Sequence, residues 1–174
     1  MSMELTIVLV VVCCLILLLC YILHLKNPPP ENYLKNATLF SNEEMISCTD
    51  PVHLVGIPDL VYETHDGYLY VVDIKTRRDL RVYYSDVIQI SVYALILATI
   101  HGRDKVLRTG YILLKKNRDD VGKYVRLELL TEEEVCKLYD RFIGIENSSI
   151  TAKLTTEESR CKVCPTRVYC QRFN

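Results

Sequence analysis

The longest hydrophobic run of the chain lies at its start, where Leu5–Leu23 contains nineteen residues and no charged side chain. A helix of that length is about 28 Å long, enough to cross the hydrocarbon core of a bilayer. A cleaved signal peptide is the alternative, but no basic residue precedes the run and no Ala-x-Ala-like site follows it. We therefore expect an anchor over residues 1–25, with membrane contact through 5–25, and a Pro-rich linker over 26–38.

Two short β-rich runs further along the chain are separated by a turn sequence. The runs are Leu60–Thr64 and Tyr68–Ile74, and residues 65–67 between them read His-Asp-Gly. Such a pattern predicts a β-hairpin. A loop of three residues would place Gly67 in the left-handed conformation that these loops favour.

The length of that loop decides which side chains meet at the far end of the hairpin. A two-residue loop would pair Asp59 with Ile74 and send Asp59 and Asp73 to opposite faces. A three-residue loop places Asp59 directly opposite Asp73. Lys75, two residues further on, then points to the same side.

The remaining pattern predicts an α/β domain. A helix from an N-cap at Ser85 to about Ile100, closed by Gly102, is apolar nearly all round and is therefore expected to be buried. The other expected elements are a short strand near Met45–Cys48, strands at Leu107–Leu114 and Lys123–Leu130, and a helix from Thr131, with a Glu134 capping box, to Gly144.

Length and charge add two limits. With 174 residues the chain suits one compact domain, and a net charge of −1 provides no overall basic field for nucleic acid. Any phosphate contacts must therefore come from local clusters. These are Arg77, Arg78 and Arg81; Lys115, Lys116 and Arg118; and Arg160, Lys162, Arg167 and Arg172.

The aspartate pair at the hairpin end is the candidate chemical site. Two carboxylates about 5 Å apart repel each other by about 3 kcal/mol at an effective dielectric constant near 20. A cation would relieve that repulsion, and carboxylate oxygens suit Mg²⁺ or Mn²⁺, which can activate water at a phosphodiester. Lys75 would orient the nucleophile or stabilise the phosphate. Alternatively, Asp59 caps a strand end, and Asp73 with Lys75 forms a solvated edge pair.

The Gly-x-Pro-Asp sequence ending at Asp59, the hairpin and the Asp73-x-Lys75 sequence together resemble the PD-(D/E)xK nuclease superfamily. The similarity is greatest to its RecB-like branch, which contains the CRISPR-associated exonucleases. It implies a restriction-endonuclease-like core over residues 39–174, with a central mixed sheet flanked by helices. It also implies that Asp59 and Asp73 bind metal and that Lys75 is catalytic.

Two further positions match the same branch. Gln89 and Tyr93 lie four residues apart on one helix face and resemble its Gln-x-x-x-Tyr motif, which positions DNA and the active-site strands. A hydrogen-bonded polar pair in a core is the alternative. RecB-like nucleases also have an upstream His at the metal site. His53 is the candidate here, and an ordinary loop His is an equal alternative.

Eight cysteines divide unevenly along the chain, and Cys13, Cys14 and Cys20 fall in the hydrophobic run. Near the other end, the spacing Cys161-x-x-Cys164-x₅-Cys170 suits soft metals, either zinc or iron–sulfur. The resemblance implies a 4Fe-4S cluster held by this Cys cluster (161–170) and one upstream cysteine, for which Cys48 is the candidate. Zinc remains the alternative.

Together these features predict a membrane-anchored, metal-dependent DNA nuclease, by resemblance an exonuclease acting on single-stranded DNA ends. A silent nuclease-fold adaptor that binds DNA or protein is the alternative. Lys26 and Lys35 follow the hydrophobic run, and no Lys or Arg precedes it, which favours a single-pass protein with a cytoplasmic C-terminal domain. Glycosylation sequons at Asn36 and Asn147 suggest the opposite, luminal orientation.

Overall fold

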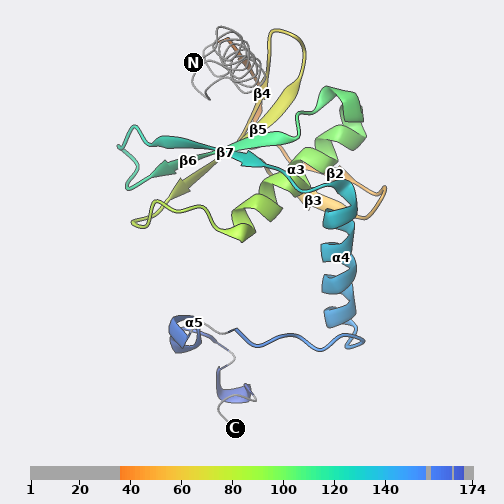
Figure 1. Cartoon of the computed structure of the whole chain (residues 1–174), viewed down its shortest axis with the longest axis vertical. Helices are drawn as coiled ribbons and strands as arrows, with labels where there is room; N and C mark the ends of the chain where they lie inside the picture. Colours follow the sequence, from red (N-terminus) through yellow and green to blue (C-terminus); the bar gives the residue numbers. More distant parts are fainter. Residues whose placement is uncertain (1–35, 156–157, 166, 171–174) are drawn as a thin grey trace, which may run out of the picture. The chain divides into compact units, whose positions relative to one another are not determined.

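The computed structural model describes residues 36–155, 158–165 and 167–170. Its contacts divide the chain into a first unit that ends at Val135 and a second that begins at Cys136 (Figure 1). The expected anchor over residues 1–25 and most of the expected linker lie outside the described residues. They therefore remain sequence-based expectations.

A five-stranded mixed sheet forms the centre of the first unit. Its order is β1-β4-β5-β6-β7, and only β5 and β6 run parallel. The strands are β1 (Thr38–Asn42), β4 (Leu60–Glu63), β5 (Leu69–Thr76), β6 (Thr109–Lys115) and β7 (Lys123–Glu128). Parallel neighbours need a crossover, which the long helix α3 (Tyr84–His101) and the short η1 (Arg103–Lys105) provide. The predicted α/β domain with a central mixed sheet is confirmed.

The β4–β5 hairpin has the predicted three-residue loop. Leu60 pairs with Val72, and the Thr64 N–H donates to the Tyr68 carbonyl at 2.8 Å, so residues 65–67 form the loop. Gly67 has a φ of 77°, a left-handed conformation that glycine adopts without strain. Continued by one residue, this register places the two aspartates of the predicted site, Asp59 and Asp73, opposite each other.

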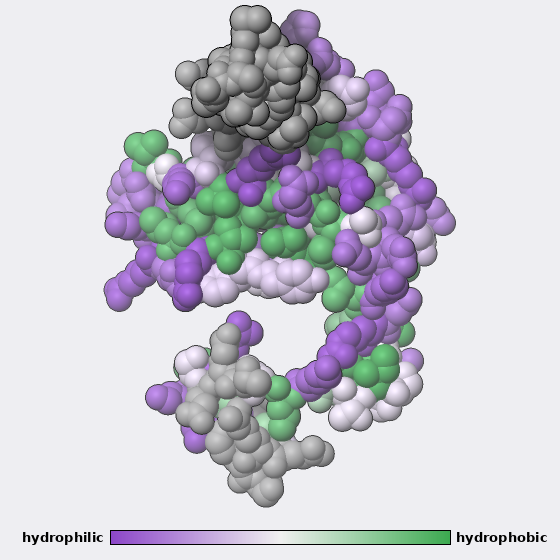
Figure 2. Space-filling view, in the orientation of Figure 1, coloured by the Kyte–Doolittle hydropathy of each residue, from purple (hydrophilic) through white to green (hydrophobic). Residues whose placement is uncertain are grey.

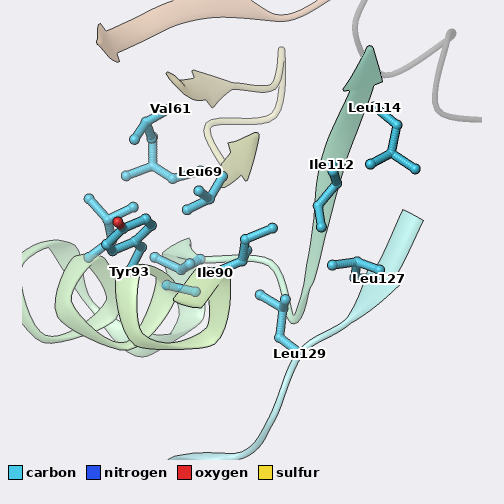
Figure 3. Close-up of a cluster of buried hydrophobic side chains, with 12 residues drawn as sticks. Val61, Leu69, Ile90, Tyr93, Ile112, Leu114, Leu127 and Leu129 are labelled. Atoms are coloured by element: carbon cyan, nitrogen blue, oxygen red, sulfur yellow. The ribbon is translucent and has the colours of Figure 1, made fainter. Parts of the chain in front are cut away.

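Helix α3 packs its apolar side chains on one face of the sheet. Figure 3 shows Ile90 and Tyr93 from α3 facing Leu69, Ile112 and Leu129 in one buried cluster. Within the described part of the chain, α3 is the one helix long and apolar enough to cross a membrane, but its place in this cluster identifies it as a core helix.

The start of α3 differs from the prediction. Its N-cap is Tyr83 rather than Ser85, and the Tyr83 N–H donates to the Asp86 carboxylate at 2.8 Å. An acceptor three residues into the helix satisfies an amide that has no partner within the helix. The capping interaction therefore moves the helix start by two residues.

A smaller antiparallel sheet, β2 (Ile46–Cys48) paired with β3 (Leu54–Gly56), contacts the same helix. The predicted short strand near Met45–Cys48 is thereby confirmed. Gly56 at the end of β3 has a close neighbour, since a Cβ atom there would lie 2.3 Å from Cε1 of Tyr93. Only glycine lets the Tyr93 ring lie at this position.

The remaining helices follow the sheet. Helix α4 (Glu132–Glu146) begins with the predicted capping box, in which the Thr131 N–H donates to Glu134 at 2.7 Å and the Glu134 N–H donates to the Thr131 hydroxyl at 3.2 Å. The helix continues past its predicted end at Gly144. Hydrophilic side chains cover most of its visible surface (Figure 2). The short α5 (Glu158–Lys162) and η2 (Arg167–Tyr169) follow.

Candidate active site

Asp73 and Lys75 lie on β5 and face the helix, on the same side of the sheet as the buried Val71. The Lys75 ammonium is 2.9 Å from Oδ2 of Asp73 in an ion pair. Asp59, just before β4, accepts a hydrogen bond of 2.6 Å from the backbone N–H of Ile74. The three predicted residues are therefore gathered at one end of the hairpin.

The Asp73 carboxylate is buried. Asp73 is only 1% exposed, and its buried Oδ2 lies 2.9 Å from the Lys75 ammonium. No other hydrogen-bond donor of the described residues contacts this oxygen. Burial raises the pKa of Asp73, the Lys75 ammonium opposes that rise, and the Asp59 charge adds to it. The Lys75 ammonium therefore offsets part of the cost of burying this carboxylate.

A short hydrogen-bond chain fixes the other side of Lys75. Its ammonium donates to Oε1 of Gln89 at 2.9 Å, and Nε2 of Gln89 donates to the Tyr93 hydroxyl at 2.8 Å. Gln89 and Tyr93 lie four positions apart, one helical turn, on the same face of α3. The structure thus joins the two predicted positioning residues to the predicted lysine, through contacts that sequence alone did not specify.

A second contact between the same strand end and helix start involves Arg77 and Asp86. The guanidinium donates to both carboxylate oxygens, at 3.1 and 2.9 Å, and Asp86 is only 5% exposed. Burial would raise the pKa of Asp86, but the hydrogen bonds from Arg77 and the Tyr83 N–H outweigh it and hold that pKa below its usual range. Sequence reasoning missed Asp86. Its position three residues before Gln89 is the signal that could have identified it.

Some side chains of the predicted basic clusters form ion pairs within the fold, and others remain accessible to a phosphate. Arg77 is held by Asp86, and Arg81 by Asp79. Arg78, Lys116 and Arg118 are exposed, with no ion pair among the described residues. Part of the basic surface predicted to contact phosphate is therefore structural.

A pocket of about 600 Å³ opens at the ends of β6 and β7. Its lining residues are Leu80, Leu114, Lys116, Asn117, Asp119, Asp120, Gly122 and Lys123. Leu114 is the strand partner of Lys75, whereas Asp59, Asp73, Lys75 and Gln89 do not line this pocket. The Asp120 carboxylate is engaged by the N–H groups of Lys116 and Gly122, which lower its pKa.

A hard divalent cation fits the donors at the hairpin end. Asp59 and Asp73 carry carboxylate oxygens, the ligand type that Mg²⁺ and Mn²⁺ prefer, and Oδ2 of Asp73 has no protein hydrogen-bond donor near it besides the Lys75 ammonium among the described residues. Among the described residues no three His, Cys, Asp or Glu side chains gather, so water and phosphate oxygens would complete the coordination. His53 is exposed ahead of β3, and its role as a ligand stays a prediction.

The cysteines are placed as follows. Cys161 is buried in α5, Cys164 and Cys170 are half-buried, and Cys48 donates weakly to the Val52 carbonyl at 3.7 Å. Residues 36–155, 158–165 and 167–170 contain no gathered set of three such side chains. The arrangement shown does not itself form a cluster site, so the 4Fe-4S cluster stays a prediction from the spacing.

Comparison with known proteins identifies the family. No curated protein matches the chain significantly. A solved structure titled "Crystal structure of SSO0001" shares the fold with a TM-score of 0.50 at 20% identity, covering 90% of this chain and 70% of that one. The model of the PD-(D/E)XK nuclease superfamily matches residues 21–171, which include the hairpin, the Asp59–Asp73–Lys75 group and the Gln89–Tyr93 pair. The chain therefore belongs to the PD-(D/E)XK nuclease superfamily.

Proposed function

We propose that the protein is a DNA nuclease that depends on Mg²⁺ or Mn²⁺ and hydrolyses phosphodiester bonds at the end of the β4–β5 hairpin. The observation that carries the proposal is the buried Asp73 carboxylate, whose Oδ2 lies 2.9 Å from the Lys75 ammonium and has no other donor among the described residues. Membership of the nuclease superfamily supports the same reaction.

The roles of the residues follow from their contacts. Asp59 and Asp73 would hold the cation, which when bound supplies an activated water and offsets charge on the phosphate. The Lys75 side chain is 24% exposed, so its ammonium is accessible to substrate while it contacts Asp73 and Gln89. It orients the attacking water or stabilises the charge that develops on the phosphate. Gln89 and Tyr93 hold that ammonium in place.

The proposed substrate is single-stranded DNA, cleaved from an end. The family branch that the motifs resemble supports this choice. The pocket at the end of β6 would receive backbone phosphates from the DNA strand through Lys116 and Lys123, whose ammonium groups form no ion pair among the described residues. Phosphate contacts of this kind hold a strand without reading its sequence.

Two further parts of the proposal rest on sequence. Cys161, Cys164 and Cys170, with Cys48 as the fourth ligand, would hold a 4Fe-4S cluster, and zinc is the alternative. The hydrophobic run over residues 5–23 would anchor the protein with its nuclease domain in the cytoplasm. Protease protection on intact cells tests the orientation, and glycosylation at Asn36 or Asn147 would contradict it.

The experiment incubates the full chain, in detergent, with end-labelled single-stranded and double-stranded DNA. Cleavage that requires Mg²⁺ or Mn²⁺ and favours the single strand supports the proposal. Successive shortening from the labelled end indicates an exonuclease. Binding without cleavage under every metal condition would instead support the adaptor alternative.

A further inference from the structure

Two polar contacts in succession join the end of β5 to the start of α3. Lys75 donates to Gln89 at 2.9 Å, and Arg77, directly after the end of β5, donates to Asp86 at 2.9 and 3.1 Å. Asp86 precedes Gln89 by three residues, so the two acceptors lie on one face of the helix. The second contact therefore constrains where Gln89 sits relative to Lys75.

Arg77 is itself held from several sides. Its backbone N–H donates to the Lys115 carbonyl at 2.9 Å, and its guanidinium donates to the Arg81 carbonyl at 3.3 Å. The guanidinium carbon lies 5.0 Å from the centre of the Tyr83 ring, over the residue that caps α3. Arg77 therefore contacts the end of β6 through its backbone, and the following loop and the helix start through its side chain, so this one residue orders all three.

Charge gives the contact a second consequence. Asp86 is buried, and its negative charge acts on both Asp73 and Lys75. Arg77 neutralises that charge at close range. Without Arg77, Lys75 would be the nearest remaining cation that the structure connects to Asp86, and it would be drawn from Asp73 toward the helix start.

We propose that Arg77 and Asp86 are positioning residues for Lys75. Their ion pair fixes α3 against the end of β5, so that Gln89 holds the Lys75 ammonium beside Asp73, and it cancels a buried charge that competes for that ammonium. This inference rests on the proposed function, because it concerns the residue assigned to act on the phosphate.

The test compares Arg77→Gln, Asp86→Asn and the double variant in the full chain in detergent. Arg103→Gln is the matched control, because Arg103 pairs with Glu132 at 2.8 Å while 64% exposed. One measurement is kcat and KM for DNA cleavage at saturating Mn²⁺. The other is the NMR resonance of Lys75 Cε in protein with ¹³C-labelled lysine, assigned with Lys75→Arg.

Arg77→Gln is expected to lower kcat by about ten- to a hundredfold with KM changed less than about threefold, since misplacement affects the chemical step. It should also shift the Lys75 resonance. The double variant, which removes both charges, should recover part of kcat and move the resonance back. Arg103→Gln should change neither quantity.

Three results would overturn the proposal. The first is a folded Arg77→Gln protein with the original kcat and Lys75 resonance. The second is a double variant no better than Arg77→Gln alone. If Arg77→Gln does not fold, Asp86→Asn is the test variant instead. The third overturning result is then an Asp86→Asn protein with unchanged kcat and an unchanged Lys75 resonance. A parent protein without any cleavage contradicts the proposed function alone, because the resonance still reports the position of Lys75.

Discussion

The Lys75 ammonium donates a hydrogen bond to the Gln89 side-chain carbonyl at 2.9 Å, across the space between β5 and α3. The amide nitrogen of Gln89 in turn donates to the Tyr93 hydroxyl at 2.8 Å. The amide is thereby oriented with its oxygen toward the lysine. A helix residue thus determines where the lysine lies.

Gln89→Met should lower the cleavage rate by about tenfold, because a methionine of similar length cannot accept the lysine hydrogen bond. Tyr93→Phe should have a smaller effect of a few fold, since it leaves the Gln89 oxygen in place. Steady-state rates with saturating metal measure both. Equal rates for Gln89→Met and the parent protein would show that Lys75 does not depend on this chain of contacts.

Gly56→Ala should disturb the same hydrogen-bond chain at its Tyr93 end. The added methyl would lie 2.3 Å from Cε1 of Tyr93, so the ring must move. Overpacking of this kind costs about 1–3 kcal/mol of folding free energy, which chemical denaturation would measure. We expect cleavage to fall as well. Val55→Ala, at a position 53% exposed in the same strand, is the control and should change neither property.

Metal binding should weaken in mild acid. Burial raises the pKa of Asp73, so this carboxylate takes up a proton at a higher pH than an ordinary aspartate. A divalent cation must displace that proton, and its affinity should therefore fall as pH decreases, by up to about tenfold per pH unit below the pKa. Lys75→Ala removes the opposing ammonium and should start the loss at a higher pH.

Calorimetric titration with Mn²⁺ at several pH values measures this effect. Asp73→Asn is the comparison variant, because it removes the buried carboxylate and with it the pH dependence that this carboxylate causes. An affinity that stays constant down to about pH 5, as expected for unperturbed carboxylates, would contradict the account.

The C-terminal cysteines should give the anaerobically purified protein a brown colour and absorption near about 400 nm, typical of iron–sulfur clusters. Cys161→Ser, Cys164→Ser and Cys170→Ser should each abolish both features, whereas Cys136→Ser, at a cysteine of α4, should not. Cys48→Ser tests the fourth ligand. A colourless protein with stoichiometric zinc would replace the cluster with a zinc site, and a protein without metal would contradict both.

The hairpin register was predictable because it depends on local chemistry. Gly67 suits the left-handed third position of a three-residue loop, and a loop of that length places Asp59 opposite Asp73. The capping box at Thr131 was equally local. Both features follow from residues within a few positions of each other.

Other features depend on tertiary contacts that no local pattern specifies. Ser85 is a reasonable N-cap by residue type, but Asp86 binds both Arg77 and the Tyr83 N–H, and so moves the helix start to Tyr83. For the same reason Arg77 was assigned to the phosphate surface, although it is engaged within the fold. Strand β1 has no strong alternating pattern, and it was missed.

The most direct measurement of the central claim compares DNA cleavage by the parent protein, Asp73→Asn, Lys75→Met and Arg103→Gln in Mn²⁺. Each substitution keeps the approximate size of its side chain, and circular dichroism checks folding. We expect Asp73→Asn and Lys75→Met each to lose about a hundredfold or more in rate, with Arg103→Gln unchanged and EDTA abolishing the parent activity. Full cleavage by folded Lys75→Met, or cleavage that persists in EDTA, would contradict the account.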